Sequence, residues 1–115
     1  PILVENVGNA LADVNITGPS SAFWSSVTFP HTSDYFSAKI GNGSQSGQVS
    51  YNASESITTY TALPASGVNT TFVKSFNNKN SNDEFRIDVN ITVPTQEPKG
   101  NKDVDILLTG WYVGI

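Results

Sequence analysis

The sequence predicts an all-β domain, a two-sheet antiparallel β-sandwich of about seven to nine strands. Apolar and polar residues alternate with a period of two in several segments. Turn-forming residues separate these segments at intervals of about 8–12 residues. No stretch of a dozen residues has the apolar spacing of an amphipathic helix. A length of 115 residues fits one domain, residues 1–115.

The clearest alternation lies between Glu84 and Val93. Every odd-numbered position from Phe85 onward is apolar, whereas Arg86, Asp88 and the other even-numbered positions are polar. This pattern predicts a half-buried antiparallel strand with five apolar side chains in the core and polar side chains in solvent.

Two further segments alternate in the same way. In Ala10–Thr17 the even-numbered positions are apolar, which predicts that Asp13, Asn15 and Thr17 face solvent. Near the C-terminal end the apolar residues lie on both faces, so this strand is expected to be covered on both sides. The residues on the two faces are Val104, Ile106 and Leu108, then Trp111 and Val113.

The remaining predicted strands follow from β-prone runs bounded by Gly, Pro and Asn. They are Ile2–Val7, Ala22–Phe29, Tyr35–Ile40, Gln48–Asn52, Ser56–Thr61 and Val68–Phe76. The runs at residues 57–61 and 68–73 are Thr-rich and uncharged, and an uncharged edge strand tends to bind a partner unless it is covered. Strand edges are therefore candidate contact surfaces.

Composition excludes several classes of protein. Charged residues are only 14% of the chain, and Asn, Ser and Thr together make about a third of it. A net charge of −4 with six scattered basic residues argues against a nucleic-acid partner. The absence of cysteine excludes disulfides and thiolate chemistry. No apolar run is long enough for membrane insertion. Without a methionine, Pro1 is not a translation start, and any signal peptide is expected to have been removed.

Two segments resemble Ig-like domains of archaeal and bacterial extracellular surface and filament proteins. The first is Ile2-Leu3-Val4-Glu5-Asn6-Val7-Gly8-Asn9-Ala10 followed by Ala12-Asp13-Val14-Asn15-Ile16; the second runs from Ile91-Thr92-Val93-Pro94 through Glu97-Pro98-Lys99-Gly100 to Val104-Asp105-Ile106. The resemblance implies an Ig-like sandwich at the cell surface. In such domains a further strand often precedes the first motif, so a neighbouring subunit is a plausible donor of a strand.

Five Asn-x-Ser/Thr sequons are candidate N-glycosylation sites. They are Asn15, Asn42, Asn52, Asn69 and Asn90. Their strand phase or Gly-rich context predicts accessibility for Asn15, Asn42 and Asn90. The alternative is that all five are ordinary polar surface residues.

Metal and catalytic sites have weaker signals. Asp83, Asp103 and Asp105 are the candidate ligands, and Ca²⁺ is the ion that such oxygen ligands would hold. No DxDxDG spacing is present, and lysines lie beside them, so a solvated surface is the favoured interpretation and no cofactor is expected. The single histidine, His31, has no recognisable catalytic spacing around it. We expect no enzymatic activity.

The sequence thus favours a structural or interaction module of an extracellular surface protein or filament subunit. It would self-associate, or bind neighbouring domains of its own protein, by strand addition. The alternative is a carbohydrate-binding or adhesin module that uses a Ca²⁺ loop or exposed aromatic rings at Trp24, Trp111 and Tyr112. Burial of these rings would remove the main support for that alternative.

Overall fold

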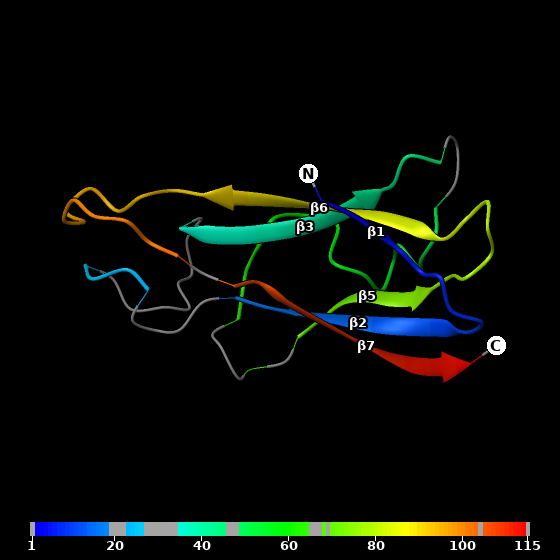
Figure 1. Cartoon of the computed structure of the whole chain (residues 1–115). Helices are drawn as coiled ribbons and strands as arrows, with labels where there is room; N and C mark the ends of the chain where they lie inside the picture. The colour runs from blue at the N-terminus through cyan, green and yellow to red at the C-terminus, as the bar shows by residue number, and fades with distance from the viewer. Residues whose placement is uncertain are drawn as a thin grey trace.

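The computed structural model describes residues 2–18, 23–26, 35–45, 49–64, 68, 70–103 and 105–114. These residues form two antiparallel β-sheets that lie as two layers (Figure 1). No helix occurs in this part of the chain, and none that could cross a membrane is found there. The all-β prediction and the two-sheet arrangement are confirmed.

The first sheet has four strands and the second has three. In the first, the order is β1 (Ile2–Glu5), β6 (Glu84–Ile91), β3 (Phe36–Asn42) and β4 (Thr61–Ala62). In the second, the order is β5 (Thr71–Phe76), β2 (Leu11–Thr17) and β7 (Leu107–Gly114). The central strands are therefore β6 and β3 in one sheet and β2 in the other.

One hydrophobic core joins the two sheets. Phe85 of β6 and Phe76 of β5 meet edge to face across the layers, with ring centroids 4.8 Å apart. This geometry is favoured because the positive edge of one ring meets the negative face of the other. The buried core residues are Val14, Ile16, Trp24, Phe36, Ala38, Ile40, Tyr51, Leu63, Phe72, Val73, Phe76, Phe85 and Ile87.

Two of the predicted strands are largely replaced by irregular chain. Residues 49–52 form no strand, and of the predicted strand Ser56–Thr61 only Thr61 lies in one. The segment still supplies single backbone hydrogen bonds: Ile57 accepts from the N–H of Ile40 and donates to the carbonyl of Phe72, both at 2.9 Å. Ile57 thus links β3 to β5. The prediction for Ala22–Phe29 lies mostly outside the described residues, and residues 23–26 are not a strand.

The alternation in β6 predicts the core only in part. Phe85 and Ile87 are buried and Val89 packs against the core, but Ile91 is 51% exposed. Figure 1 shows this end of β6 extending past the strands of the second sheet. The second sheet therefore does not cover Ile91, although Phe36 opposite it is buried against Phe23. A strand pattern alone cannot show where the opposing sheet stops.

The prediction that the polar side chains of β2 face solvent is wrong. Asp13, Asn15 and Thr17 are all buried. The pairing of β2 with β5 is irregular on both sides of Val14, and Ser75 of β5 adopts a positive φ of 56°. Such bulges redirect side chains, and here they bring β5 polar groups onto β2. The hydroxyl of Thr71 donates to the side-chain oxygen of Asn15 at 3.0 Å.

The two sides of the layered structure differ. On one side Ile57 bridges β3 and β5, so the layers are joined by backbone hydrogen bonds. On the other side lie the edge strands β1 and β7, both in the foreground of Figure 1. In the part of the chain that the structure describes, no backbone pairing connects these two strands. We call this side the open edge.

Candidate interaction edge formed by β1 and β7

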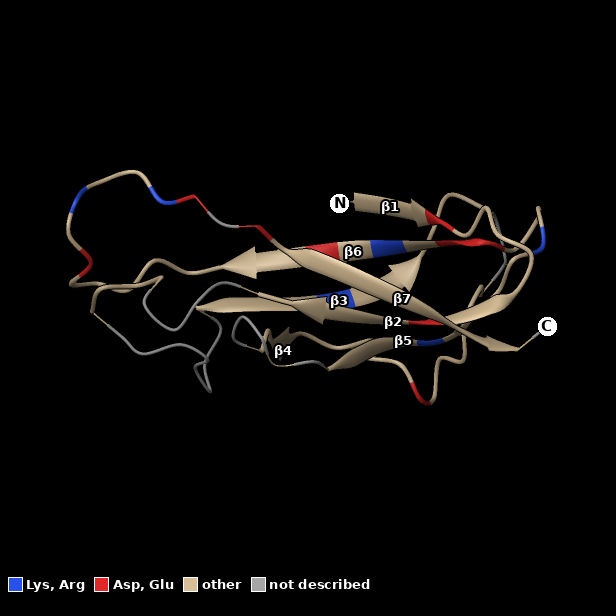
Figure 2. Cartoon of the chain, turned by 60° about the horizontal axis from the view of Figure 1, so that its bottom comes forward, with Lys and Arg blue, Asp and Glu red and all other residues tan. Residues whose placement is uncertain are grey.

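Strand β7 presents an apolar, uncharged edge. Leu107, Trp111, Tyr112 and Val113 are exposed to 61%, 40%, 66% and 42%. Figure 2 shows no charged residue along β7, whereas β6 carries both signs of charge. Within the described residues β7 pairs only with β2, so its other side has no strand partner. Natural proteins usually protect such an edge with charges, prolines or a covering segment.

Some of the exposed side chains belong to the core-facing side of their strands. Gly110 lies opposite Val14 of β2, and Tyr112 lies opposite Ala12. Because directly opposed residues share a face of the sheet, Tyr112 points to the same side as the buried Val14. In the other sheet Ile2 lies opposite the buried Ile87, yet Ile2 is 51% exposed. The core therefore opens to solvent at the open edge.

The three candidate sugar-stacking residues do not form one platform. Trp24 is buried and packs edge to face on Phe23, with centroids 4.7 Å apart. Trp111 and Tyr112 are exposed, but they are consecutive residues of one strand and point to opposite faces. The three rings therefore do not form a single sugar-stacking surface, which was the arrangement that best supported the carbohydrate-binding alternative.

The glycosylation candidates have different surroundings. Asn42 ends β3 and is exposed, and Asn52 is exposed at the start of a turn, where its side-chain oxygen accepts a hydrogen bond from the Ser54 hydroxyl at 2.8 Å. Asn90 is half-buried on β6, and Asn15 is buried between strands. Asn69 lies outside the described residues.

The carboxylates considered as metal ligands are not brought together. Asp83 is buried and bound by Gln45: the Gln45 amide nitrogen donates to its carboxylate at 2.6 Å, and the Asp83 N–H donates back to the Gln45 oxygen at 3.0 Å. Asp103 and Asp105 are exposed. Among the described residues no three His, Cys, Asp or Glu side chains form a group that could hold a metal ion. His31 lies outside those residues.

A second carboxylate, that of Glu84, accepts hydrogen bonds in the same region. The backbone N–H and the hydroxyl of Ser44 both donate to Glu84, and these hydrogen bonds lower the pKa of the Glu84 carboxyl below its ordinary value. Together the Gln45–Asp83 and Ser44–Glu84 contacts join the turn after β3 to the start of β6. These acids therefore have structural partners within the chain.

Sequence reasoning missed a carboxylate clamp at the opposite end of the molecule. Both oxygens of Glu97 accept hydrogen bonds from consecutive backbone amides, those of Ser25 and Ser26, each at 3.0 Å. The Lys102 ammonium lies 3.2 Å from the same carboxylate. Burial alone would raise the pKa of Glu97, but these donors, with the Ser26 hydroxyl, lower it to about 2. Ser25 and Ser26 lie 72 and 71 residues from Glu97 in the sequence, and no shared motif could have revealed the contact.

We expect the clamp to weaken in acid. The pKa of Glu97 in the folded protein is lowered from 4.5 to about 2. Its contribution to folding stability is therefore complete above pH 4.5 and is lost as the pH falls toward 2. Trp24 is next to Ser25, so its fluorescence in a Trp111→Phe background should shift to the red over this pH range. In Glu97→Gln the shift should already be present at neutral pH. An identical acid titration in both proteins would contradict the clamp.

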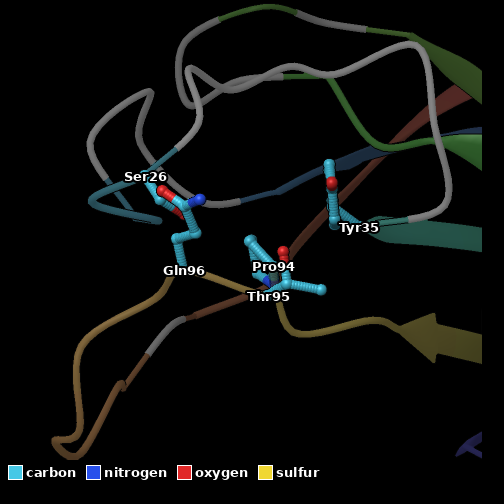
Figure 3. Close-up of a pocket in the computed structure, with 5 residues that line it drawn as sticks. All are labelled: Ser26, Tyr35, Pro94, Thr95 and Gln96. Carbon is cyan, nitrogen blue, oxygen red and sulfur yellow. The ribbon is translucent and has the colours of Figure 1, made fainter.

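A small pocket lies beside the clamp (Figure 3). It has a volume of about 190 Å³ and is lined by Ser26, Tyr35, Pro94, Thr95 and Gln96. Small-molecule sites are typically about 300–1,000 Å³, so this pocket is smaller than most of them. The described residues that line it include no carboxylate, imidazole or amine.

Comparisons with known proteins add no identification. No family model matches the sequence, and no curated protein or solved structure matches it.

Proposed function

We propose that the chain is a structural module, Ig-like in architecture, of an extracellular surface protein or filament subunit. It associates with protein partners through exposed strand edges and carries N-linked glycans. The observation that carries this proposal is the uncharged edge of β7: four of its large apolar side chains are exposed, and no described strand pairs with its outer side.

The open edge is energetically costly in an isolated domain. Exposed apolar area disfavours the unpaired state, and the free N–H and C=O groups of an edge strand are a template for another strand. Strand addition satisfies both needs at once. The polar, weakly charged surface and the exposed sequons at Asn42 and Asn52 support an extracellular, glycosylated module.

Light scattering after size-exclusion chromatography, with electron microscopy of native material, tests the proposal. We expect concentration-dependent assembly, and we expect Val113→Lys to reduce it because a lysine on an edge opposes strand addition. Thr59→Lys, at an exposed position away from β7, is the matched control and should leave assembly unchanged. Protein that stays monomeric at every concentration, with no effect of either substitution, would contradict the proposal.

Glycan occupancy should follow exposure. Peptide mass spectrometry of protein purified from its native host is expected to find glycan mass on Asn42 and Asn52, which are exposed. Asn15 should be unmodified in folded protein because its side chain is buried and hydrogen-bonded to Thr71. A glycan on Asn15 in folded material would contradict the placement of β2.

A further inference from the structure

We propose that β7 pairs antiparallel with β7 of a second copy of the same chain, about a two-fold axis that lies midway between the two Gly110 residues. This inference rests on the proposed function, since it specifies which edge associates and with what. The second sheets of the two copies would join into one continuous six-stranded sheet, with β7 and its copy at the centre. The open edge of each copy would then be covered by the other.

Symmetry leaves few ways to pair the strand with itself. Two adjacent antiparallel strands are related by a two-fold axis perpendicular to the sheet, so core-facing residues must lie opposite core-facing residues. This requirement means that one residue of β7 lies directly opposite its own copy, with the axis between them. Nearly full overlap of Leu107–Gly114 is then obtained only when that residue is Gly110 or Trp111.

The Gly110 register matches the side chains better. On the core side it places Leu108 opposite Tyr112 of the second copy and the two Gly110 residues opposite each other. It also places Leu107 opposite Val113 of the second copy, at the point where the pairing of β7 with β2 becomes irregular. Directly opposed aromatic and aliphatic side chains stabilise an antiparallel pair. In the Trp111 register, by contrast, Leu108 would lie opposite Gly114 and lose this contact.

Charge and area favour a second copy as the occupant. The protein has a net charge of −4, but β7 carries no charge, so two copies can meet here without bringing like charges together. Pairing along β7 would bury on the order of 1,000 Å² in total, near the lower bound for a specific interface. The association is therefore expected to be reversible and dependent on concentration.

Single-cysteine variants can show which residues of the two β7 strands lie opposite each other, because the chain has no native cysteine. Directly opposed residues have Cα atoms about 4.5–5.5 Å apart, which is within the range of a disulfide. A mixture of Leu107→Cys and Val113→Cys protein should form disulfide-linked dimers under mild oxidation. A mixture of Thr109→Cys and Val113→Cys should not, and neither should Val113→Cys alone, since the two copies of residue 113 would lie far apart.

Each result decides the question. Cross-linking confined to the 107–113 mixture supports the pairing. Preferred cross-linking of the 109–113 mixture would overturn the Gly110 register, and preferred linking of like positions would overturn the antiparallel arrangement. If light scattering shows assembly but none of these mixtures links, the β7 pairing is wrong while the proposed function stands. If the wild-type protein is monomeric throughout, both fail.

Discussion

Replacing Phe85 by alanine is expected to lower the free energy of unfolding by about 3–5 kcal/mol, as measured by urea denaturation followed by fluorescence. Phe85 is fully buried in β6 and packs edge to face on Phe76 of the opposite sheet. The substitution removes this contact between the layers and leaves a cavity where the two sheets meet. Because a close-packed core relaxes only partly around a cavity, lost contacts and lost burial both contribute.

Ile91→Ala is the matched control for this prediction. Ile91 lies in the same strand and the same alternating series as Phe85, but it is 51% exposed. Its replacement should cost less than about 1 kcal/mol, the range of strand propensity. Equal losses from the two substitutions would contradict the finding that β6 extends past the opposing sheet.

Asp13→Ala is expected to cost about 2–4 kcal/mol, measured in the same denaturation experiment. The buried carboxylate of Asp13 accepts the backbone N–H of Ser75 at 2.9 Å and pairs with the Lys74 ammonium at 2.9 Å. The Ser75 amide is part of the β5 bulge, where φ is 56°. Without the carboxylate this part-buried donor loses its acceptor, and the positive φ of Ser75 loses the hydrogen bond that offsets its cost.

Two further substitutions separate the roles of Asp13. Asp13→Asn keeps an acceptor for the Ser75 amide and loses only the pair with the half-exposed Lys74, so its cost should be about 1 kcal/mol. Ser75→Gly should leave stability within about 1 kcal/mol of the wild type, on the more stable side, because glycine adopts positive φ without a steric cost. If Asp13→Asn were as damaging as Asp13→Ala, the ion pair and not the bulge amide would be the main contribution.

The hydrogen bond between Lys74 and Asp13 also changes the pKa of Lys74. The hydrogen bond and charge of Asp13 raise the pKa of Lys74 above its ordinary value. A raised lysine pKa means that this contribution to stability is complete below the unfolded pKa of 10.5 and is lost as the pH rises through the folded value. Titration of Lys74 therefore affects stability at the alkaline end of the pH range, whereas titration of Glu97 affects it at the acidic end.

Local patterns predicted most of the strands but not their surroundings. Alternation identified β2 and β6 because a period of two is a property of the strand itself. It could not show that Ile91 lies beyond the opposing sheet, since that depends on the length of strands elsewhere in the chain. Nor could it show that Asp13 and Asn15 are buried, because a bulge in β5 places the covering groups there.

The candidate site was predictable only in outline. The sequence indicated that strand edges matter, but it favoured the Thr-rich runs at residues 57–61 and 68–73. Of the described residues in those runs, Ile57 bridges β3 and β5, and Phe72 and Val73 are in the core. Both runs do reach edge strands, β4 at Thr61 and β5 at Thr71. The edge strand with four exposed large apolar side chains is nevertheless β7, whose apolar residues resemble core residues when read without their neighbours. The strand order decides which strands lie at the edges of the sheets, and no local sequence pattern contains that order.

The directions of β1 and β7 have a mechanical consequence. Both strands run the same way along the long axis of the molecule, so that the start of β1 and the end of β7 point in opposite directions (Figure 2). Tension applied at residues 2 and 114 would therefore act parallel to both strands. Hydrogen bonds between strands lie across this direction, so those of β1 with β6 and of β2 with β7 would be loaded in shear and would share the load. A domain held in this way resists extension far better than one whose strands are peeled apart bond by bond.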